Sequence, residues 1–265
     1  MRPYYNENQT IAKRGVFVLS LARIILGGLL MGLETSYLSY IESSIKQTFG
    51  TAVKGLRMFE LGDQEIVLNG LGEHIPEKTG KAYFTNRGYE HVSVDLNGLN
   101  GAIVRDLTRP EQFQEWHGSW DVLTNAGTTE HVEPFESQYE CFGIIHDCVK
   151  VGGLAIHLLP DVFEHDQHGT WKNHCRHYYS KSFFELLAKE CSYELLSNTV
   201  INGLRCATVK KTKNVPFMRD RSTFLGAIAQ RDPISHPTDI PRKLLKRMGV
   251  GRSLRRVGLR RFFPR

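Results

Sequence analysis

Apolar residues between Arg57 and Pro160 come in short runs, and the segments between them have helical spacing. The runs predict strands over 58–62, 91–95, 102–106, 120–125 and 154–159. Two later runs, over 193–200 and 204–211, predict an antiparallel hairpin. Helices are predicted over 35–49, 81–87, 137–150 and 182–191, the last one opening at a capping box that starts at Ser182. Short strands that alternate with helices are typical of a parallel sheet.

Acidic residues and glycines gather where these apolar runs end. The first run ends at Glu60 and Gly62, the second ends at Asp95, and the run over 120–125 leads into Asn125 and Gly127. In parallel sheets, ligands bind at the carboxyl ends of the strands. The pattern therefore predicts a binding site formed by these ends.

This order of features resembles the class I S-adenosylmethionine (SAM)-dependent methyltransferases, over roughly residues 57–212. The resemblance implies an α/β fold with a Rossmann-like sheet, mostly parallel with an antiparallel C-terminal hairpin, and helices on both faces. It also implies SAM as cofactor and methyl transfer to an oxygen or nitrogen of a small-molecule or cell-envelope/glycan-type acceptor. The cofactor-binding residues that it implies are Glu60, Leu61, Gly62, Asp63, Gln64, Asp95, Leu96, Asp106, Leu107, Asn125, Ala126 and Gly127.

Two of these residues have specific implied roles. Asp95 stands where the family has the acid that holds the ribose hydroxyls, and Asp106 stands where the adenine amino group is met. SAM carries a sulfonium cation and no phosphate, so acids near the first turn are compatible with it. A dinucleotide site would need Gly-x-Gly-x-x-Gly, which is absent here.

The sequence departs from the family after the first strand. Gly62-Asp63-Gln64 stands where the family has Gly-x-Gly, so the close backbone approach that a second glycine permits is lost. This departure leaves open a non-catalytic binding module that docks to a membrane surface or nucleic acid. A nucleic-acid methyltransferase is disfavoured, because Asn125-Ala126-Gly127-Thr128 replaces the Asn-Pro-Pro-Tyr-like loop expected for a flipped base.

Three histidines are candidate catalytic bases: His131, His174 and His177. A histidine beside the acceptor can take a proton from a hydroxyl or amine, although a structural role for His131 is an equal alternative. Histidines, acids and Cys175 also crowd the segment after the strand over 154–159. They show no paired ligand spacing, so a substrate-facing loop is favoured and no metal is predicted.

Composition sets the remaining expectations. Among 265 residues, five cysteines form no Cys-x-x-Cys pair, which favours a reducing, cytoplasmic compartment. The predicted organisation is an N-terminal helical extension over 1–50, the methyltransferase domain over 51–213, a linker over 214–241 and a basic tail over 242–265.

Charge is concentrated in that tail. Residues 242–265 hold ten Lys and Arg and no acid, so the net charge of +6 becomes −4 when they are set aside. Apolar residues between the cations predict peripheral binding to an anionic membrane surface, with nucleic acid less favoured and a solvated disordered tail as the alternative. The segment 15–33 is apolar but contains Arg23, so packing on the domain or at an interface is expected rather than spanning.

Overall fold

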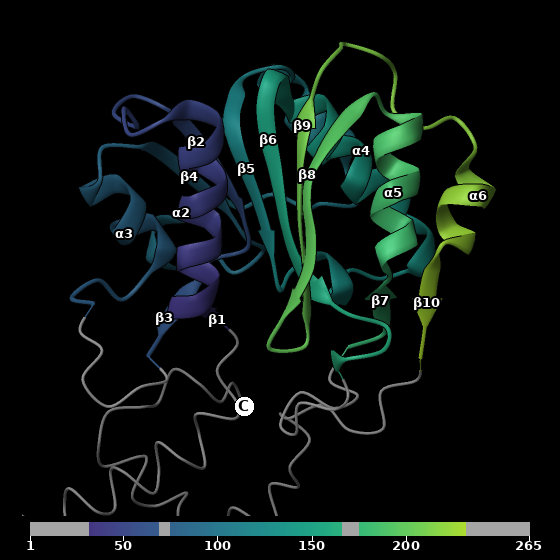
Figure 1. Ribbon diagram of the computed structural model, residues 1–265, viewed down its shortest axis with the longest axis horizontal. Helices are drawn as coiled ribbons and strands as arrows, with labels where there is room; N and C mark the ends of the chain where they lie inside the picture. Colours follow the sequence, from purple (N-terminus) through teal and green to yellow (C-terminus); the bar gives the residue numbers. More distant parts are fainter. Residues whose placement is uncertain (1–31, 69–74, 166–174, 232–265) are drawn as a thin grey trace, which may run out of the picture.

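The computed structural model describes residues 32–68, 75–165 and 175–231, and its centre is a six-stranded sheet (Figure 1). The strand order is β4-β2-β5-β6-β9-β8. In chain order the strands are β2 (Arg57–Leu61), β4 (Glu90–Val94), β5 (Trp120–Ala126), β6 (Val149–Pro160), β8 (Tyr193–Ile201) and β9 (Leu204–Lys211). All neighbours pair in parallel except β9, which runs antiparallel to both β6 and β8. The predicted mostly parallel sheet with an antiparallel C-terminal hairpin is confirmed.

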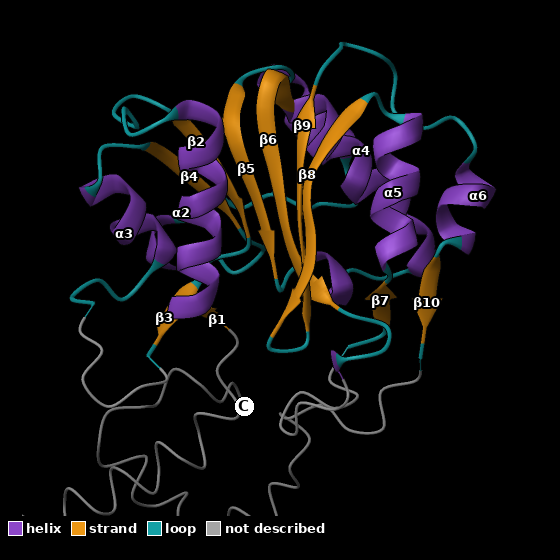
Figure 2. Ribbon diagram, viewed as in Figure 1, coloured by secondary structure: helices purple, strands orange, loops and turns teal. Residues whose placement is uncertain are grey.

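Helices cover both faces of the sheet (Figures 1 and 2). They are α2 (Thr35–Phe49), α3 (Gly80–Asn86), α4 (Gln138–Cys148), α5 (Lys181–Glu190) and α6 (Arg221–Gly226). Successive strand residues point to opposite faces. Met58 and Val122 accordingly share a core with α2 and α3, while Phe59 and Leu123 share the other core with α4 and α5.

Residues 32–49, which belong to the predicted N-terminal extension, pack as part of the domain. β1 (Gly32–Glu34) pairs in parallel with β3 (Glu65–Val67), which follows the first turn of the sheet. From α2, Leu38, Ile41 and Ile45 are buried in the core. The pairing brings residues some thirty positions upstream of β3 to the same edge as the predicted site.

The segment predicted as a linker also differs from expectation. Within 214–231, α6 is capped by Asp220, whose carboxylate accepts hydrogen bonds from two backbone amides. The helix buries Phe224. It is followed by β10 (Ile228–Gln230), which pairs antiparallel with β7 (His177–Tyr179). Buried apolar side chains are the reason that this polar-looking segment packs on the domain.

Two local predictions are wrong. The strand over 102–106 is reduced to one bridge between Val94 and Ile103, because Gly98 and Gly101 take left-handed conformations just before it and Val104 stays 64% exposed. The α5 helix is capped by Ser180, whose hydroxyl accepts a hydrogen bond from the Phe183 amide at 3.2 Å. The capping box expected at Ser182 is therefore not formed.

Residues 1–31, His174 and the basic tail over 242–265 lie outside the described residues, so the expectations placed on them stay predictions. Among the helices that are described, none combines the length and the apolarity needed to cross a bilayer. All five cysteines are buried as free thiols.

Candidate functional site

Gly62 makes the sharp turn that ends β2. Its φ of +82° is a left-handed conformation, and its amide donates to the Val94 carbonyl at 2.8 Å. A Cβ atom on this residue would lie 2.5 Å from the Thr128 hydroxyl. Only glycine fits there, because both the conformation and the space exclude a side chain.

Asp95 lies at the carboxyl end of β4, beside the Gly62 turn. Its Oδ2 accepts a hydrogen bond from the Asp63 amide at 3.2 Å, and its Oδ1 accepts one from the Asn97 amide at 2.9 Å. Each oxygen has a further lone pair for a ligand hydroxyl. The neighbouring Leu96 is 70% exposed, so an apolar surface borders the carboxylate.

Asp63 stands next to this carboxylate. The Asn100 amide donates to Asp63 Oδ2 at 2.7 Å. Partial burial, reinforced by the negative charge of Asp95 and opposed by the Asn100 hydrogen bond, raises the pKa of Asp63. Two acids thus share one turn, which suits a cationic or hydroxyl-bearing ligand better than an anion.

The Asp106 carboxylate stabilises the turn that follows it. Its Oδ1 accepts hydrogen bonds from the Thr108 amide at 2.9 Å and the Thr108 hydroxyl at 2.8 Å, which lower the pKa of the carboxyl. The side chain is 33% exposed, so part of it still faces solvent. Leu107 is buried in the core.

Gln64 occupies the position where the family has its second glycine. Its side chain is buried, and its Nε2 donates to the Thr128 hydroxyl at 3.2 Å. That hydroxyl in turn donates to the Leu61 carbonyl at 2.8 Å. Gln64 therefore ties the loop after β2 to the loop after β5.

Asn125, near the end of β5, holds the loop that follows this strand. Its amide nitrogen donates to the Thr129 hydroxyl at 2.9 Å and lies 3.3 Å from His157 Nδ1. Asn125 is fully buried, so its side chain holds the loop in place. Ala126 and Gly127, the next two residues, line the pocket described below.

Glu60 points into the protein interior. One of its oxygens lies 2.8 Å from His91 Nε2, and a Cβ on Gly80 would be 2.8 Å from the other. Burial is the main cause of its raised pKa. The structure places Glu60 under α3, outside the residues that line the pocket.

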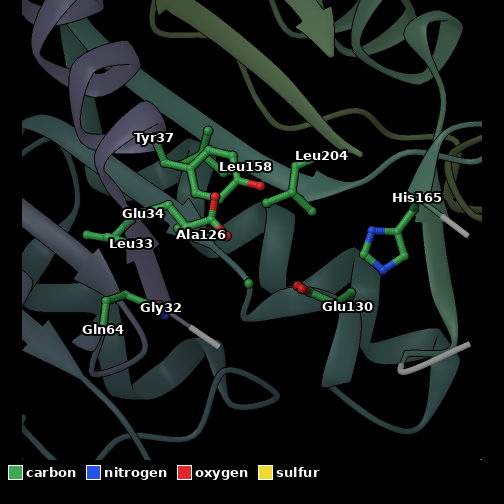
Figure 3. Close-up of a pocket in the computed structure, with 11 residues that line it drawn as sticks. Gly32, Leu33, Glu34, Tyr37, Gln64, Ala126, Glu130, Leu158, His165 and Leu204 are labelled. Atoms are coloured by element: carbon green, nitrogen blue, oxygen red, sulfur yellow. The ribbon is translucent and has the colours of Figure 1, made fainter. Parts of the chain in front are cut away.

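A pocket that is partly open to solvent lies over the ends of β5 and β6 (Figure 3). Its lining residues are Gly32, Leu33, Glu34, Tyr37, Gln64, Ala126, Gly127, Glu130, Leu158, His165 and Leu204. Aliphatic side chains form much of its wall, and two carboxyl groups, a phenol and an imidazole interrupt it. An apolar pocket with few polar groups is the usual form of a small-molecule site.

Neither described member of the predicted histidine set lines this pocket. His131 is exposed, with its Nε2 3.9 Å from Glu130 Oε1. His177 is buried, with its Nδ1 3.1 Å from Gln138 Nε2, and burial lowers its pKa. Within the described ranges, no three His, Cys, Asp or Glu side chains gather as a metal site.

Sequence comparison gives no relatives: no protein-family model matches this chain, and no curated protein matches it. Solved structures resemble it at low identity. The chain is similar to the 1,6-didemethyltoxoflavin-N1-methyltransferase of Burkholderia thailandensis, with 13% identity and a TM-score of 0.46, covering 80% of this chain and 93% of that one. It is also similar to a TehB-like SAM-dependent methyltransferase from Corynebacterium glutamicum, with 15% identity and a TM-score of 0.41, covering 65% and 87%. A third is the PH0226 protein of Pyrococcus horikoshii OT3, with 16% identity and a TM-score of 0.46, covering 66% and 90%.

The fold is defined by the strand order of the sheet. The order β4-β2-β5-β6-β9-β8, with β9 antiparallel, matches the sheet that the motifs predict. The chain has the class I methyltransferase fold. Of the predicted cofactor-binding residues, Gln64, Ala126 and Gly127 line the pocket, whereas Gly62 and Asp95 lie outside its lining.

Among the lining residues that the predicted site does not contain are the acids Glu34 and Glu130 and the phenol of Tyr37. Glu130 could have been found, because it is an acid in the loop after a buried strand, directly before His131. No sequence signal pointed to Glu34 and Tyr37. Their place in the pocket depends on the pairing of β1 with β3, which the pattern of apolar runs does not reveal.

Proposed function

We propose that this protein is a SAM-dependent methyltransferase that moves a methyl group to an oxygen or nitrogen of a small-molecule acceptor. The observation that carries the proposal is the hydrogen bonding of Asp95. Each of its two carboxylate oxygens accepts one hydrogen bond from a backbone amide and has a further lone pair that can accept from a ribose diol. The class I methyltransferase fold supports it, because Asp95 ends the strand next to β2 in this sheet.

The described residues fit this cofactor. Leu96, 70% exposed beside Asp95, offers an apolar surface to the adenine ring. Asp63 and Asp95 suit a positively charged ligand, and the left-handed Gly62 turn lets the backbone approach it. When bound, SAM supplies an electrophilic methyl group on its sulfonium. The chain's own contribution is to hold the acceptor in line with that methyl group and to exclude water.

The acceptor would occupy the pocket between the loop after β5 and the β1–α2 segment. Its aliphatic walls favour a molecule with apolar parts, and a cell-envelope or glycan-type acceptor is the wider class in our proposal. Of the described histidines proposed as bases, His131 has its Nε2 3.9 Å from Oε1 of Glu130, which lines this pocket.

A second candidate function is a binding module without catalysis. The buried Gln64 side chain favours it, because it fills volume that a second glycine would leave for the cofactor.

In either case we propose that the segment 242–265 docks the protein to the anionic inner face of a membrane, on the basis of its ten cations and interspersed apolar residues.

Titration of SAM and of its demethylated product, S-adenosylhomocysteine, tests the proposal. Replacing Asp95 by alanine should weaken the binding of both by at least about tenfold, or about 1.4 kcal/mol, with a normal melting curve. Glu90→Ala is the matched control, because Glu90 is exposed at the opposite end of the same strand. Unchanged affinity in Asp95→Ala would remove the assigned role. Tight binding with no methylated product from any acceptor would favour the binding module.

A further inference from the structure

The Glu130 side chain is 1% exposed and lines the pocket, with its carboxyl group pointing into the pocket (Figure 3). Among the described residues, its Oε2 has no hydrogen-bond partner. The other oxygen, Oε1, lies 3.9 Å from His131 Nε2, which is too far for a hydrogen bond. A buried carboxyl oxygen without a partner costs stability, so Oε2 calls for a ligand that completes it.

The backbone on both sides of Glu130 is held rigidly. The Gln138 side-chain amide donates to the Thr129 carbonyl at 2.6 Å and to the Val132 carbonyl at 3.0 Å. Gln138 is itself fully buried, and its Oε1 accepts a hydrogen bond from the Tyr179 hydroxyl at 2.7 Å. A carboxyl on such a support cannot easily turn to solvent, which is the arrangement that a preorganised functional group requires.

The surroundings of Glu130 contain few charges of either sign. Burial raises the pKa of the Glu130 carboxyl to about 8. Among the described lining residues there is no lysine or arginine. The titratable groups that face Glu130 are Glu34 from β1, Tyr37 from α2, His131 from its own loop, His165 after β6, and Tyr179 and His177 from β7. A second carboxyl and no fixed cation make the pocket unfavourable for an organic anion.

We propose that Glu130 binds the nucleophilic O–H or N–H of the acceptor and takes its proton, and that the acceptor is a neutral or cationic molecule rather than an organic anion. This inference rests on the proposed methyltransferase function and names the acceptor class of the same site. It moves the role of base from the predicted histidines to a carboxylate inside the pocket.

The step balances as a simple displacement. The lone pair of the acceptor oxygen or nitrogen forms a bond to the methyl carbon, while the carbon–sulfur bond breaks and its electron pair stays on sulfur. The acceptor's proton passes to Oε2 of the ionised Glu130 carboxylate, so the step proceeds only in molecules in which Glu130 has already lost its own proton. The positive charge of the sulfonium and the negative charge of the Glu130 carboxylate disappear together. The net charge of the buried site therefore does not change, which lowers the electrostatic cost of the transfer.

Three probes of similar shape and different charge test the acceptor class: benzylamine, benzyl alcohol and benzoate. Each is titrated into the full-length protein saturated with S-adenosylhomocysteine. The wild type should bind benzylamine or benzyl alcohol at least about tenfold more tightly than benzoate. Near pH 7, benzylamine should release a proton from the protein, because an ammonium ion stabilises the ionised carboxylate. Titration in two buffers of different ionisation enthalpy measures that release.

Glu130→Gln keeps the shape of the side chain and removes its proton chemistry. The variant should reduce the preference for benzylamine or benzyl alcohol over benzoate to below about threefold. It should also abolish the proton release, with affinity for S-adenosylhomocysteine unchanged. Glu136→Gln, the same change at an exposed site in the same connection, should behave as wild type. Selectivity and proton release that survive in Glu130→Gln would overturn the inference, as would benzoate binding most tightly or no probe binding. Failure of S-adenosylhomocysteine itself to bind would instead overturn the proposed function.

Discussion

Burial raises the pKa of the Glu130 carboxyl from 4.5 to about 8, and this shift links the fold to pH. In the unfolded chain the group ionises near its ordinary value, whereas in the folded protein it stays protonated until pH approaches 8. Between these values the folded state holds the extra proton. The contribution of Glu130 to stability is therefore fully present below pH 4.5 and is lost as pH rises towards 8.

Glu130→Gln should remove this dependence. The wild type is expected to lose up to about 1.4 kcal/mol of unfolding free energy per pH unit from this residue between about pH 5 and pH 8. Glutamine cannot ionise, so the difference in stability should favour the variant increasingly as pH rises. Urea denaturation at several pH values measures it. A stability difference that stays constant across this range would show that the buried carboxyl does not titrate as stated.

Single residues of the site differ in how well the sequence predicts them. Asp95 could be predicted because it follows directly from a strand whose position is set by local apolar spacing. Gln64 was recognised as a departure, but its hydrogen bond to Thr128 depends on the packing of two loops 64 residues apart. Burial of Glu130 is likewise decided by elements that come from elsewhere in the chain, so the sequence gives its location and not its environment.

At the scale of elements, the connection from β5 to α4 depends on one side chain, Gln138. Its amide group binds the Thr129 and Val132 carbonyls, and its carbonyl accepts from the Tyr179 hydroxyl. Replacing it by leucine keeps the volume and leaves these buried groups without a partner. Each such loss costs about 1–3 kcal/mol.

Gln138→Leu should therefore lower the unfolding free energy by at least about 2 kcal/mol in urea titrations. It should also weaken binding of the probes in the pocket, because Glu130 loses its support. Gln114→Leu is a suitable control, since Gln114 is exposed on the short helix before β5. Equal stability of the two variants would mean that the loop is held by other contacts.

The elements that the sequence predicts well are those with strong local periodicity. The boundaries of α2 match the expected 35–49, and β8 and β9 form the expected hairpin. The strand over 102–106 fails because two left-handed glycines precede it. The pairing of β1 with β3 and of β10 with β7 was missed because three-residue strands carry too little pattern to be recognised.

At the scale of the whole molecule, the fold extends past the predicted domain end at residue 213. Met218, Phe224 and Ile228 are at most 5% exposed and belong to the core that contains α4 and α5. The Tyr139 hydroxyl donates to the Met218 carbonyl at 2.7 Å, so the segment is also held by a hydrogen bond. These contacts bind the segment 214–231 into the domain.

Two truncated chains separate this structural segment from the basic tail. A chain that ends at Lys213 loses three buried apolar side chains and should be less stable by about 5 kcal/mol, since each is worth about 1.5–3 kcal/mol. A chain that ends at Asp232 keeps them and should unfold at the same urea concentration as the full chain. It should, however, lose binding to liposomes, because it lacks the ten cations of residues 242–265.

Sedimentation with liposomes of increasing anionic content provides the second measurement. Binding of the full chain should rise with anionic lipid and fall only in part with added salt, since buried apolar side chains add an attraction that salt does not screen. The Asp232 truncation keeps Asp95 and Glu130, so its affinity for S-adenosylhomocysteine should equal that of the full chain. If the full chain does not bind anionic liposomes and instead binds RNA or DNA with a steep dependence on salt, the tail is a nucleic-acid-binding segment. If the Lys213 truncation is as stable as the full chain, residues 214–231 are not part of the folded domain.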